Sequence, residues 1–258
     1  NNIPVIRRIS GGGTVYHDMG NINLTQISAS RKIDQLIDFR KFTQPVIDFL
    51  RQFGLEAYFA GKNNLLVNGK KFSGNSAHVL KNRVMHHGTF LYNTDLDKLE
   101  NVIHPGNNHI TDKSIKSIRA TVGNIAGYIE NPVTTVAFMR QLELFLRDYY
   151  HISTTADITP AEQQAIEKLV EEKYTRWEWN IGYSPKYSIR HEQDTEYGKF
   201  LATLEVKEGK IVGIQLVLGE KLLEKTEQKL LGQKHDKIQL RKILADNHFS
   251  EIIINTLF

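Results

Sequence analysis

Residues 64–76 carry the sequence signal that most constrains the fold. Asn68-Gly69 separates two runs of strand-forming residues, 64–67 and 70–76. Asn-Gly is a preferred pair for a two-residue hairpin turn because both turn residues take positive φ angles. The sequence therefore predicts an antiparallel hairpin here, and the strand-like runs on either side of Lys81-Asn82 predict a second one.

Helical patterns flank these strands. Residues 30–53 have apolar residues at helical spacing, and Pro45 predicts that they form two helices. Asn131-Pro132 predicts the start of a long helix that buries, among others, Val136 and Met139. Further helix and hairpin signals lie at Thr159-Pro160-Ala161-Glu162, a capping box, and at Glu208-Gly209-Lys210, a turn that precedes lysine-rich helices.

Length and composition exclude several classes of protein. The chain has 258 residues, 40% of them hydrophobic, enough for one large domain or one domain with a small second unit. No apolar run approaches the roughly 20 residues of a spanning helix, which excludes a membrane protein. A net charge of +4 suits an anionic ligand or an acidic partner and is weak support for nucleic-acid binding. We expect a cytoplasmic protein. Since the chain opens on Asn1 without Met, we also expect an upstream segment to be missing or unnumbered.

The absence of cysteine is chemically informative. The sequence contains no Cys, so it has no disulfide, no thiolate metal site and no cysteine nucleophile. His86 and His87 are adjacent, and on a regular strand they face opposite sides and cannot share one metal ion. We expect one of the pair to line a pocket and the other to pack.

A glycine-rich run between Arg7-Arg8 and Asp18 is the sharpest local feature. Ser10 is followed by three glycines at 11–13, whose backbone N–H groups can converge on an anion because no Cβ blocks close approach. The two arginines add charge and a fork for phosphate or carboxylate. The run matches neither a Walker loop nor a dinucleotide fingerprint, because it leads into a strand. A simple glycine loop with solvated arginines is the alternative interpretation.

Lys71 is the strongest candidate for a functional cation. Regular alternation predicts that Lys71, Ser73 and Asn75 share one face of their strand, with Lys70 solvated at the hairpin. A lysine on a rigid strand can be placed accurately against a phosphate or carboxylate. The basic residues 113–119 are either a solvated strand edge or a phosphate-contacting loop.

Taken in order, these segments resemble the lipoate–protein ligase A family, within the biotin/lipoate ligase catalytic-domain group. The matches cover almost the whole chain: Arg-Arg-x-Ser-Gly-Gly-Gly-x-Val-x-His-Asp at 7–18, Gly-x-Asn-Asn at 61–64, Lys-x-Ser-Gly at 71–74, His-His-Gly-Thr at 86–89, the basic stretch at 113–119 and Trp-x-Trp-Asn at 177–180. The resemblance implies an α+β (mixed α/β) fold, with a central mixed sheet flanked by helices. It also implies a catalytic domain over 1–190 and a small α+β accessory domain over 191–258.

The activity that the resemblance implies is ATP-dependent ligation in two steps. Lipoate is activated by ATP with Mg²⁺ to lipoyl-AMP, and the lipoyl group is then passed to a lysine of a lipoyl-domain protein. The implied acceptors are apo lipoyl domains of 2-oxoacid dehydrogenase E2 subunits and the glycine cleavage H protein, with no nucleic acid or membrane partner.

The resemblance also assigns roles to residues. Lys71 is implied as the catalytic residue that bridges lipoate and the α-phosphate. The remaining implied contacts are Arg7, Gly12, Gly13, Thr14 and Val15 for ATP, and Ser10, Gly11 and His87 for lipoate, followed by Asp18, Ser73 and Arg119 as lesser candidates. The family often has Asp where this chain has Asn64, which is a weaker Mg²⁺ ligand, so only Asn64 is a candidate metal ligand.

Three alternative functions are open from the sequence. A same-fold acyl transferase is disfavoured because the family's thioester route needs a cysteine. A biotin ligase is disfavoured because its glycine–arginine biotin loop is absent. A non-catalytic lipoate-binding or adaptor fragment is compatible with the missing upstream segment.

Overall fold

The computed structural model describes residues 3–29, 37–103, 109–112 and 120–258. The chain divides into two compact units. We call residues 8–104 and 115–157 the N-terminal unit, and residues 1–7, 105–114 and 158–258 the C-terminal unit. The predicted domain boundary at residue 190 is not tested by this division and stays a prediction.

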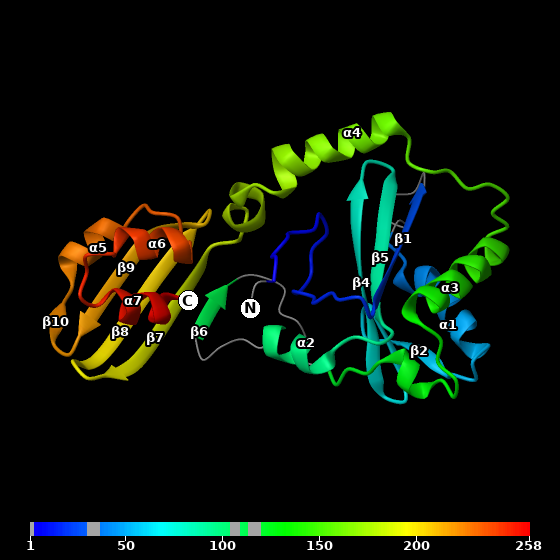
Figure 1. The fold of residues 1–258 in the computed structure, drawn as a ribbon, viewed down its shortest axis with the longest axis horizontal. Coiled ribbons are helices and arrows are strands. Elements are labelled where there is room, and N and C mark those ends of the chain that lie inside the picture. Colours follow the sequence, from blue (N-terminus) through cyan, green and yellow to red (C-terminus); the bar gives the residue numbers. More distant parts are fainter. Residues whose placement is uncertain (1–2, 30–36, 104–108, 113–119) are drawn as a thin grey trace. The chain divides into compact units, whose positions relative to one another are not determined.

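The N-terminal unit is built on a five-stranded sheet (Figure 1). Its strands are β1 (Asn21–Ala29), β2 (Ala57–Ala60), β3 (Asn64–Val67), β4 (Lys70–Leu80) and β5 (Arg83–Leu91). The order is β1-β5-β4-β3-β2, and every pair of neighbours is antiparallel. Both predicted hairpins are confirmed: Asn68 and Gly69 have φ angles of 48° and 74°, and Lys81 in the second turn has a φ of 56°.

Helices of this unit bury one face of the sheet. The core joins α1 (Phe39–Arg51) and α3 (Thr135–Tyr149) to β3, β4 and β5. Phe138 of α3 lies at its centre, with ring centroids 4.3 Å from Tyr92 and 5.2 Å from Phe49. The shorter α2 (Leu96–Ile103) and η2 (Ile125–Tyr128) lie between β5 and α3 in the chain. The opposite face of the sheet contacts Ser10 and Gly11 of the segment that precedes β1.

Two helix predictions are corrected. Pro45 lies inside α1 and does not end it, because burial of Pro45 and its neighbours against the sheet outweighs the one lost hydrogen bond. Helix α3 begins at Thr135 rather than at Pro132, and its buried face carries Phe138 and Leu142, which are four residues apart. Val136 and Met139 were expected inside but lie off this face and are 65% and 48% exposed.

The C-terminal unit has its own sheet and core. Strands β6 (His109–Asp112), β7 (Tyr187–Thr195), β8 (Gly198–Lys207), β9 (Lys210–Leu218) and β10 (Lys221–Leu222) form an antiparallel sheet in the order β10-β9-β8-β7-β6. Helices α5 (Glu224–Leu230), α6 (Lys237–Ile243) and α7 (Ser250–Leu257) bury residues against this sheet. The predicted hairpin between β8 and β9 is confirmed, whereas α7 was not predicted from the sequence.

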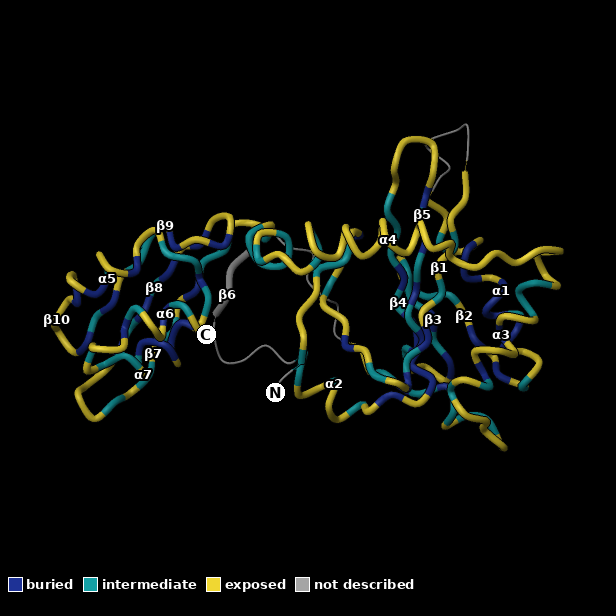
Figure 2. Tube along the Cα trace, turned by 45° about the horizontal axis from the view of Figure 1, so that its top comes forward, coloured by how far each residue is buried: buried dark blue, intermediate teal, exposed yellow. Residues whose placement is uncertain are grey.

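A helical segment precedes β7 in the chain. It consists of α4 (Pro160–Leu169), η3 (Val170–Tyr174) and η4 (Glu178–Gly182). The predicted capping box is confirmed: Thr159 accepts from the Glu162 N–H at 3.2 Å, and the Glu162 carboxylate accepts from the Thr159 N–H at 2.9 Å. Every residue of α4 is exposed, in contrast to the sheets (Figure 2).

Antiparallel sheets with helices packed against them place the chain in the α+β class, which confirms the predicted fold class. The named strands of the N-terminal sheet are paired antiparallel rather than in the mixed arrangement that was expected. Within the described residues, none of the helices combines the length and the apolar character needed to cross a bilayer.

His86 is the histidine of the adjacent pair that packs into the core. Its ring stacks on Phe42 at 5.3 Å between centroids, and its Nε2 accepts the backbone N–H of Asp38 at 3.2 Å. Burial lowers the pKa of His86, and the carboxylate of Asp38 offsets this in part. The core therefore holds the neutral ring.

Acid should destabilise the N-terminal unit through this histidine. Below about pH 6.5, His86 binds a proton in the unfolded chain but stays neutral in the folded protein. The free energy of unfolding therefore decreases as the pH is lowered from about 6.5 to the pKa of His86 in the folded protein. Each unit of pKa depression is worth about 1.4 kcal/mol. Urea unfolding at pH 7.5 and 5.0 measures the loss, which should shrink in His86→Gln. An equal acid loss in the variant would show that His86 is not the cause.

Candidate functional site

A β-bulge decides which way Lys71 faces. In the β3–β4 pair, Leu65 lies opposite Ser73 and Leu66 lies opposite Lys71, so Phe72 is an extra residue on β4. An extra residue shifts the alternation of side chains by one position. Lys71 therefore lies on the face away from the core, while Phe72 is fully buried within it.

The bulge corrects the prediction that Lys71, Ser73 and Asn75 share a face. Ser73 and Asn75 point to the core side, where they are 1% and 3% exposed. The Asn75 amide donates to the Ser73 hydroxyl at 3.3 Å. Ser73 thus lies across the sheet from Lys71, and the candidate role of Ser73 as a phosphate contact has no support from its position.

Lys71 extends over a glycine. A Cβ at Gly74 would lie 3.4 Å from both Cε and Nζ of Lys71, so the ammonium rests above the bare backbone of Gly74. Burial lowers the pKa of Lys71. An incoming carboxylate or phosphate acts in the opposite direction and favours the ammonium form. Lys71 is therefore a partly desolvated cation whose charge an anionic ligand would stabilise.

The glycine-rich loop is fastened to the same face of the sheet. Ser76 and His87 are paired across β4 and β5, two residues along from Gly74 and Thr89, so they share the face on which Lys71 lies. The Ser76 hydroxyl donates to the Gly11 carbonyl at 2.8 Å. The Ser10 hydroxyl and His87 Nε2 are hydrogen-bonded at 2.5 Å. The loop and Lys71 thus belong to one surface.

The side chain of Arg8 is hydrogen-bonded to the glycine-rich loop. Its Nη2 donates to the carbonyls of Gly11 and Gly13 at 2.8 and 3.0 Å, and its Nε donates to the Ser10 hydroxyl at 3.1 Å. In a trans peptide the next N–H points opposite to the carbonyl, and the described peptides are trans. The N–H groups of Gly12 and Thr14 consequently point away from Arg8, as an anion-binding loop requires.

Gly12 is the position in the loop that needs glycine. Its φ is +108°, a region that side chains rarely adopt, and a Cβ there would lie 2.9 Å from Arg8 Nη2. The loop conformation and the Arg8 hydrogen bonds both depend on the missing side chain.

His87 is kept neutral in this setting. Burial is the largest influence that lowers its pKa, followed by the positive charge of Arg8 and the neighbouring histidines. The expected division of the pair is therefore observed, with His86 in the core and His87 beside the loop. The role of His87 as a lipoate contact stays a prediction.

Asp18 positions the end of the loop. One carboxylate oxygen accepts the N–H of Gly20 at 2.8 Å, and the other accepts the N–H of Asp95 at 2.9 Å. Asp18 thus ties the loop to the chain that enters α2, and its geometry is that of a structural anchor.

Arg7 and Arg8 are adjacent in the sequence, but their side chains bind different parts of the chain. Arg7 belongs to the C-terminal unit, where its side chain donates to the Trp179 carbonyl at 3.0 Å and the Ser184 hydroxyl at 2.7 Å. The Trp179 indole N–H donates back to the Arg7 carbonyl at 2.8 Å. In this structure Arg8, and not Arg7, organises the glycine loop, although both arginines stand in the same motif. Arg7 as an ATP contact stays a prediction.

Two predicted site residues remain. Asn64 pairs with Gly74 across β3 and β4, which places it on the face of Lys71. Arg119 lies outside the described residues. Within the described residues there is no group of three or more His, Asp or Glu side chains able to hold a metal ion.

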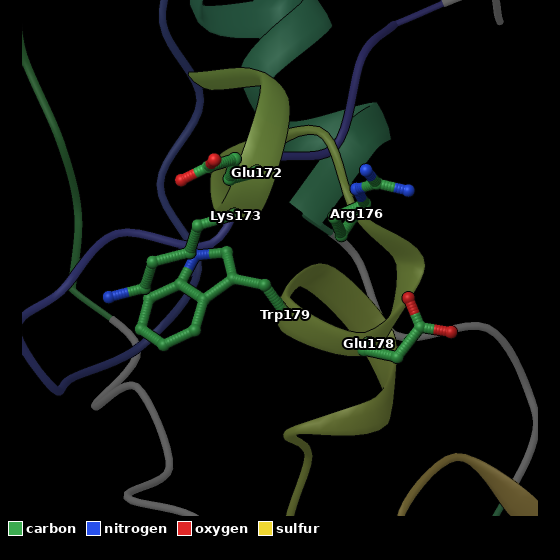
Figure 3. A pocket seen from close by; sticks show the side chains of 5 residues that line it. All are labelled: Glu172, Lys173, Arg176, Glu178 and Trp179. Atoms are coloured by element: carbon green, nitrogen blue, oxygen red, sulfur yellow. The ribbon is translucent and has the colours of Figure 1, made fainter. Parts of the chain in front are cut away.

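A surface hollow in the C-terminal unit lies among a different set of residues. It is lined by Glu172, Lys173, Arg176, Glu178 and Trp179 (Figure 3). The Lys173 ammonium lies 4.0 Å from the Trp179 ring centroid. None of these residues is among the predicted site residues, and the hollow has one aromatic wall with mixed charges around it.

The face of Lys71, Ser76 and His87, together with the loop, combines a cation, outward backbone N–H groups and a neutral imidazole. Such a set is suited to bind and polarise phosphate or carboxylate oxygens. Three residues that build it, Arg8, Ser76 and Gly74, were missed as site residues by the sequence reading. Arg8 stood in the motif, whereas the contact of Ser76 with Gly11 joins segments that are remote in sequence.

Comparison with known proteins identifies the family of the chain. The model of the lipoyl protein ligase A/B catalytic domain matches residues 1–146, and that of the bacterial lipoate protein ligase C-terminus matches residues 184–257. The lipoate-protein ligase LplJ of Bacillus subtilis is 34% identical over 95% of this chain and 74% of its own length.

Solved structures give the same relation. A lipoate-protein ligase A bound with ATP has a TM-score of 0.57 at 28% identity, over 69% of this chain and 72% of that one. A Thermoplasma acidophilum protein with bound lipoic acid has a TM-score of 0.56 at 26% identity, over 70% and 73%. A bi-partite ligase from that organism, solved in a study with its E2 lipoyl domain, has a TM-score of 0.54 at 26% identity, over 68% and 69%. The chain is a ligase enzyme and belongs to the lipoate–protein ligase family.

Proposed function

We propose that this enzyme activates lipoate with ATP and transfers the lipoyl group to a lysine of apo lipoyl domains. The observation that carries the proposal is the common surface of Lys71 and the glycine-rich loop, which offers donors for both a carboxylate and a phosphate. A relative binds ATP and another binds lipoic acid, which supports the two substrates.

In the first step, a lipoate carboxylate oxygen attacks the α-phosphorus of ATP, and pyrophosphate leaves. Lys71 would lie between the carboxylate and the α-phosphate and neutralise the charge that develops as they approach. The N–H groups of Gly12, Gly13, Thr14 and Val15 would hold the nucleotide phosphates, with Arg7 as a further ATP contact. Ser10, Gly11 and His87 would contact lipoate.

In the second step, the amine of the acceptor lysine attacks the acyl carbon and AMP leaves, which forms an amide. Acceptors of the lipoyl-domain class, including E2 subunits and the glycine cleavage H protein, are supported by the archaeal ligase studied with its E2 lipoyl domain. Because ATP is the co-substrate, we place the reaction in the cytoplasm.

Mg²⁺ would act mainly through the ATP phosphates. The described residues do not fit a metal held by protein alone, since they offer no cluster of acidic or histidine ligands and Asn64 is the single candidate. When bound with ATP, the ion would reduce the negative charge of the phosphates.

The first step can be tested by lipoate-dependent exchange of labelled pyrophosphate into ATP. The proposed enzyme catalyses exchange only when lipoate, ATP and Mg²⁺ are all present. No exchange by a folded enzyme that binds lipoate would favour the alternative of a binding fragment.

Ser76 gives a prediction about nucleotide binding. Ser76→Ala removes the donor to the Gly11 carbonyl, and one neutral hydrogen bond is worth about 0.5–1.5 kcal/mol. We expect the KM for ATP in pyrophosphate exchange to rise about two- to tenfold. Ser28→Ala on the exposed end of β1 serves as a control and should leave KM unchanged. An unaltered KM in Ser76→Ala would show that this bond does not order the loop.

A further inference from the structure

The backbone of Lys71 is supported by a segment that lies outside the named strands. β5 pairs with β4 only from Ser73 onward, opposite Phe90. At Lys71, the side of β4 away from β3 is covered by residues 121–123, in a parallel bridge between Lys71 and Val122. The Lys71 N–H donates to the Thr121 carbonyl at 2.9 Å, and the Gly123 N–H donates to the Lys71 carbonyl at 3.1 Å. The position of Lys71 therefore depends on where this segment is held.

Asn124 fastens that segment to the chain that leaves β5. Its Oδ1 accepts the backbone N–H of Thr94 at 3.0 Å, and its Nδ2 donates to the backbone carbonyl of Thr94 at 2.8 Å. One carboxamide thus satisfies both backbone groups of a residue that is 4% exposed. A second contact joins the same two segments: the Ala126 N–H donates to the Tyr92 carbonyl at 3.0 Å.

The corner at Thr94 is tied to the buried core. Tyr92, two residues earlier, is 1% exposed and stacks on Phe138 with 4.3 Å between ring centroids. Its hydroxyl donates to the Val133 carbonyl at 2.6 Å. Gly123 also fits closely against β4, because a Cβ there would lie 3.1 Å from Lys70 Cδ. Buried core, corner, Asn124, Gly123 and Lys71 form one continuous chain of contacts.

We propose that Asn124 is a positioning residue for Lys71, acting through residues 121–123 without touching the substrates. The inference rests on the proposed role of Lys71 as the cation of the adenylation step. Without the carboxamide, Thr94 loses both backbone partners, and the segment beside Lys71 loses its attachment to the core corner. A displacement of a reacting group by about 1 Å can cost a hundredfold in rate.

The test compares Asn124→Ala and Asn124→Asp with wild type in steady-state, lipoate-dependent pyrophosphate exchange. Urea unfolding first establishes that each variant is folded, so that rates refer to folded enzyme. We expect kcat to fall about ten- to a hundredfold, with the KM for lipoate within about twofold of wild type. The Asp variant keeps the size of the side chain and the acceptor for the Thr94 N–H, and it loses only the donor to the Thr94 carbonyl. If the Ala variant does not fold, the kcat of the Asp variant tests the inference. Asn93→Ala, at an exposed neighbouring position, should retain wild-type kcat.

A double-mutant cycle with Lys71→Ala separates positioning from a general structural role. If Asn124 acts through Lys71, Asn124→Ala lowers the rate in the wild-type background and changes it by less than about twofold in the Lys71→Ala background. Equal losses in both backgrounds, or wild-type kcat in both folded Asn124 variants, would overturn the inference. If Lys71→Ala itself retained full activity, the proposed function of Lys71 would fail first, and that outcome is distinct from the others.

Discussion

Lys71→Ala should lower the rate of lipoate adenylation about a hundred- to a thousandfold, the usual effect of removing one preorganised electrostatic contact in a transition state. The ammonium rests over Gly74 in a partly desolvated position on the face that also carries the glycine loop. Charge that develops between a carboxylate and a phosphate is stabilised more strongly there than in water. Single-turnover formation of lipoyl-AMP measures the effect directly.

Two further variants sharpen this prediction. Lys98→Ala is the control for the loss of one positive charge, because Lys98 is exposed on α2 and should contribute nothing to the reaction. Lys71→Arg keeps the charge but not the compact ammonium, and we expect it to recover only part of the rate. A rate for Lys71→Ala within about threefold of wild type would remove Lys71 from the transition state.

Gly12→Ala should reduce kcat/KM for ATP about ten- to a hundredfold. A side chain at a φ of +108° is strained, and the new Cβ would meet the Arg8 guanidinium that binds the carbonyls of Gly11 and Gly13. Backbone strain of this kind costs about 1–3 kcal/mol, and the variant loop would relax away from the conformation that directs its N–H groups outward. Initial rates of pyrophosphate exchange at varied ATP measure the loss.

The control for this prediction is Gly127→Ala in η2. A Cβ at Gly127 has nothing within 4 Å and its φ is not in the positive range, so activity and stability should both be retained. If Gly12→Ala behaved like this control, the loop conformation seen here would not be the one that binds ATP.

Local chemistry explains what could be predicted from the sequence. The turn at Asn68-Gly69 was predictable because it requires positive φ angles, which Asn tolerates better than most residues and Gly adopts freely for lack of a Cβ. The capping box at Thr159 was predictable because its two hydrogen bonds join residues three apart. In both cases the determining contacts lie within four residues of sequence.

Longer-range geometry explains what could not be predicted. The bulge at Phe72 arises from the register between β3 and β4, and it places Ser73 across the sheet from Lys71. Arg8 and Arg7 are indistinguishable in the motif, yet one closes on the glycine loop and the other bonds Trp179. The attachment of Asn124 to Thr94 spans 30 residues and leaves no periodic signal.

The most direct test of the ligase proposal is the intact mass of an apo lipoyl domain incubated with this protein, lipoate and Mg²⁺, with and without ATP. We predict a lipoyl mass gain on the acceptor that requires ATP and is lost with Lys71→Ala. A gain of equal size without ATP, or no gain from folded wild-type protein that binds lipoate, would contradict ATP-dependent lipoylation by this chain.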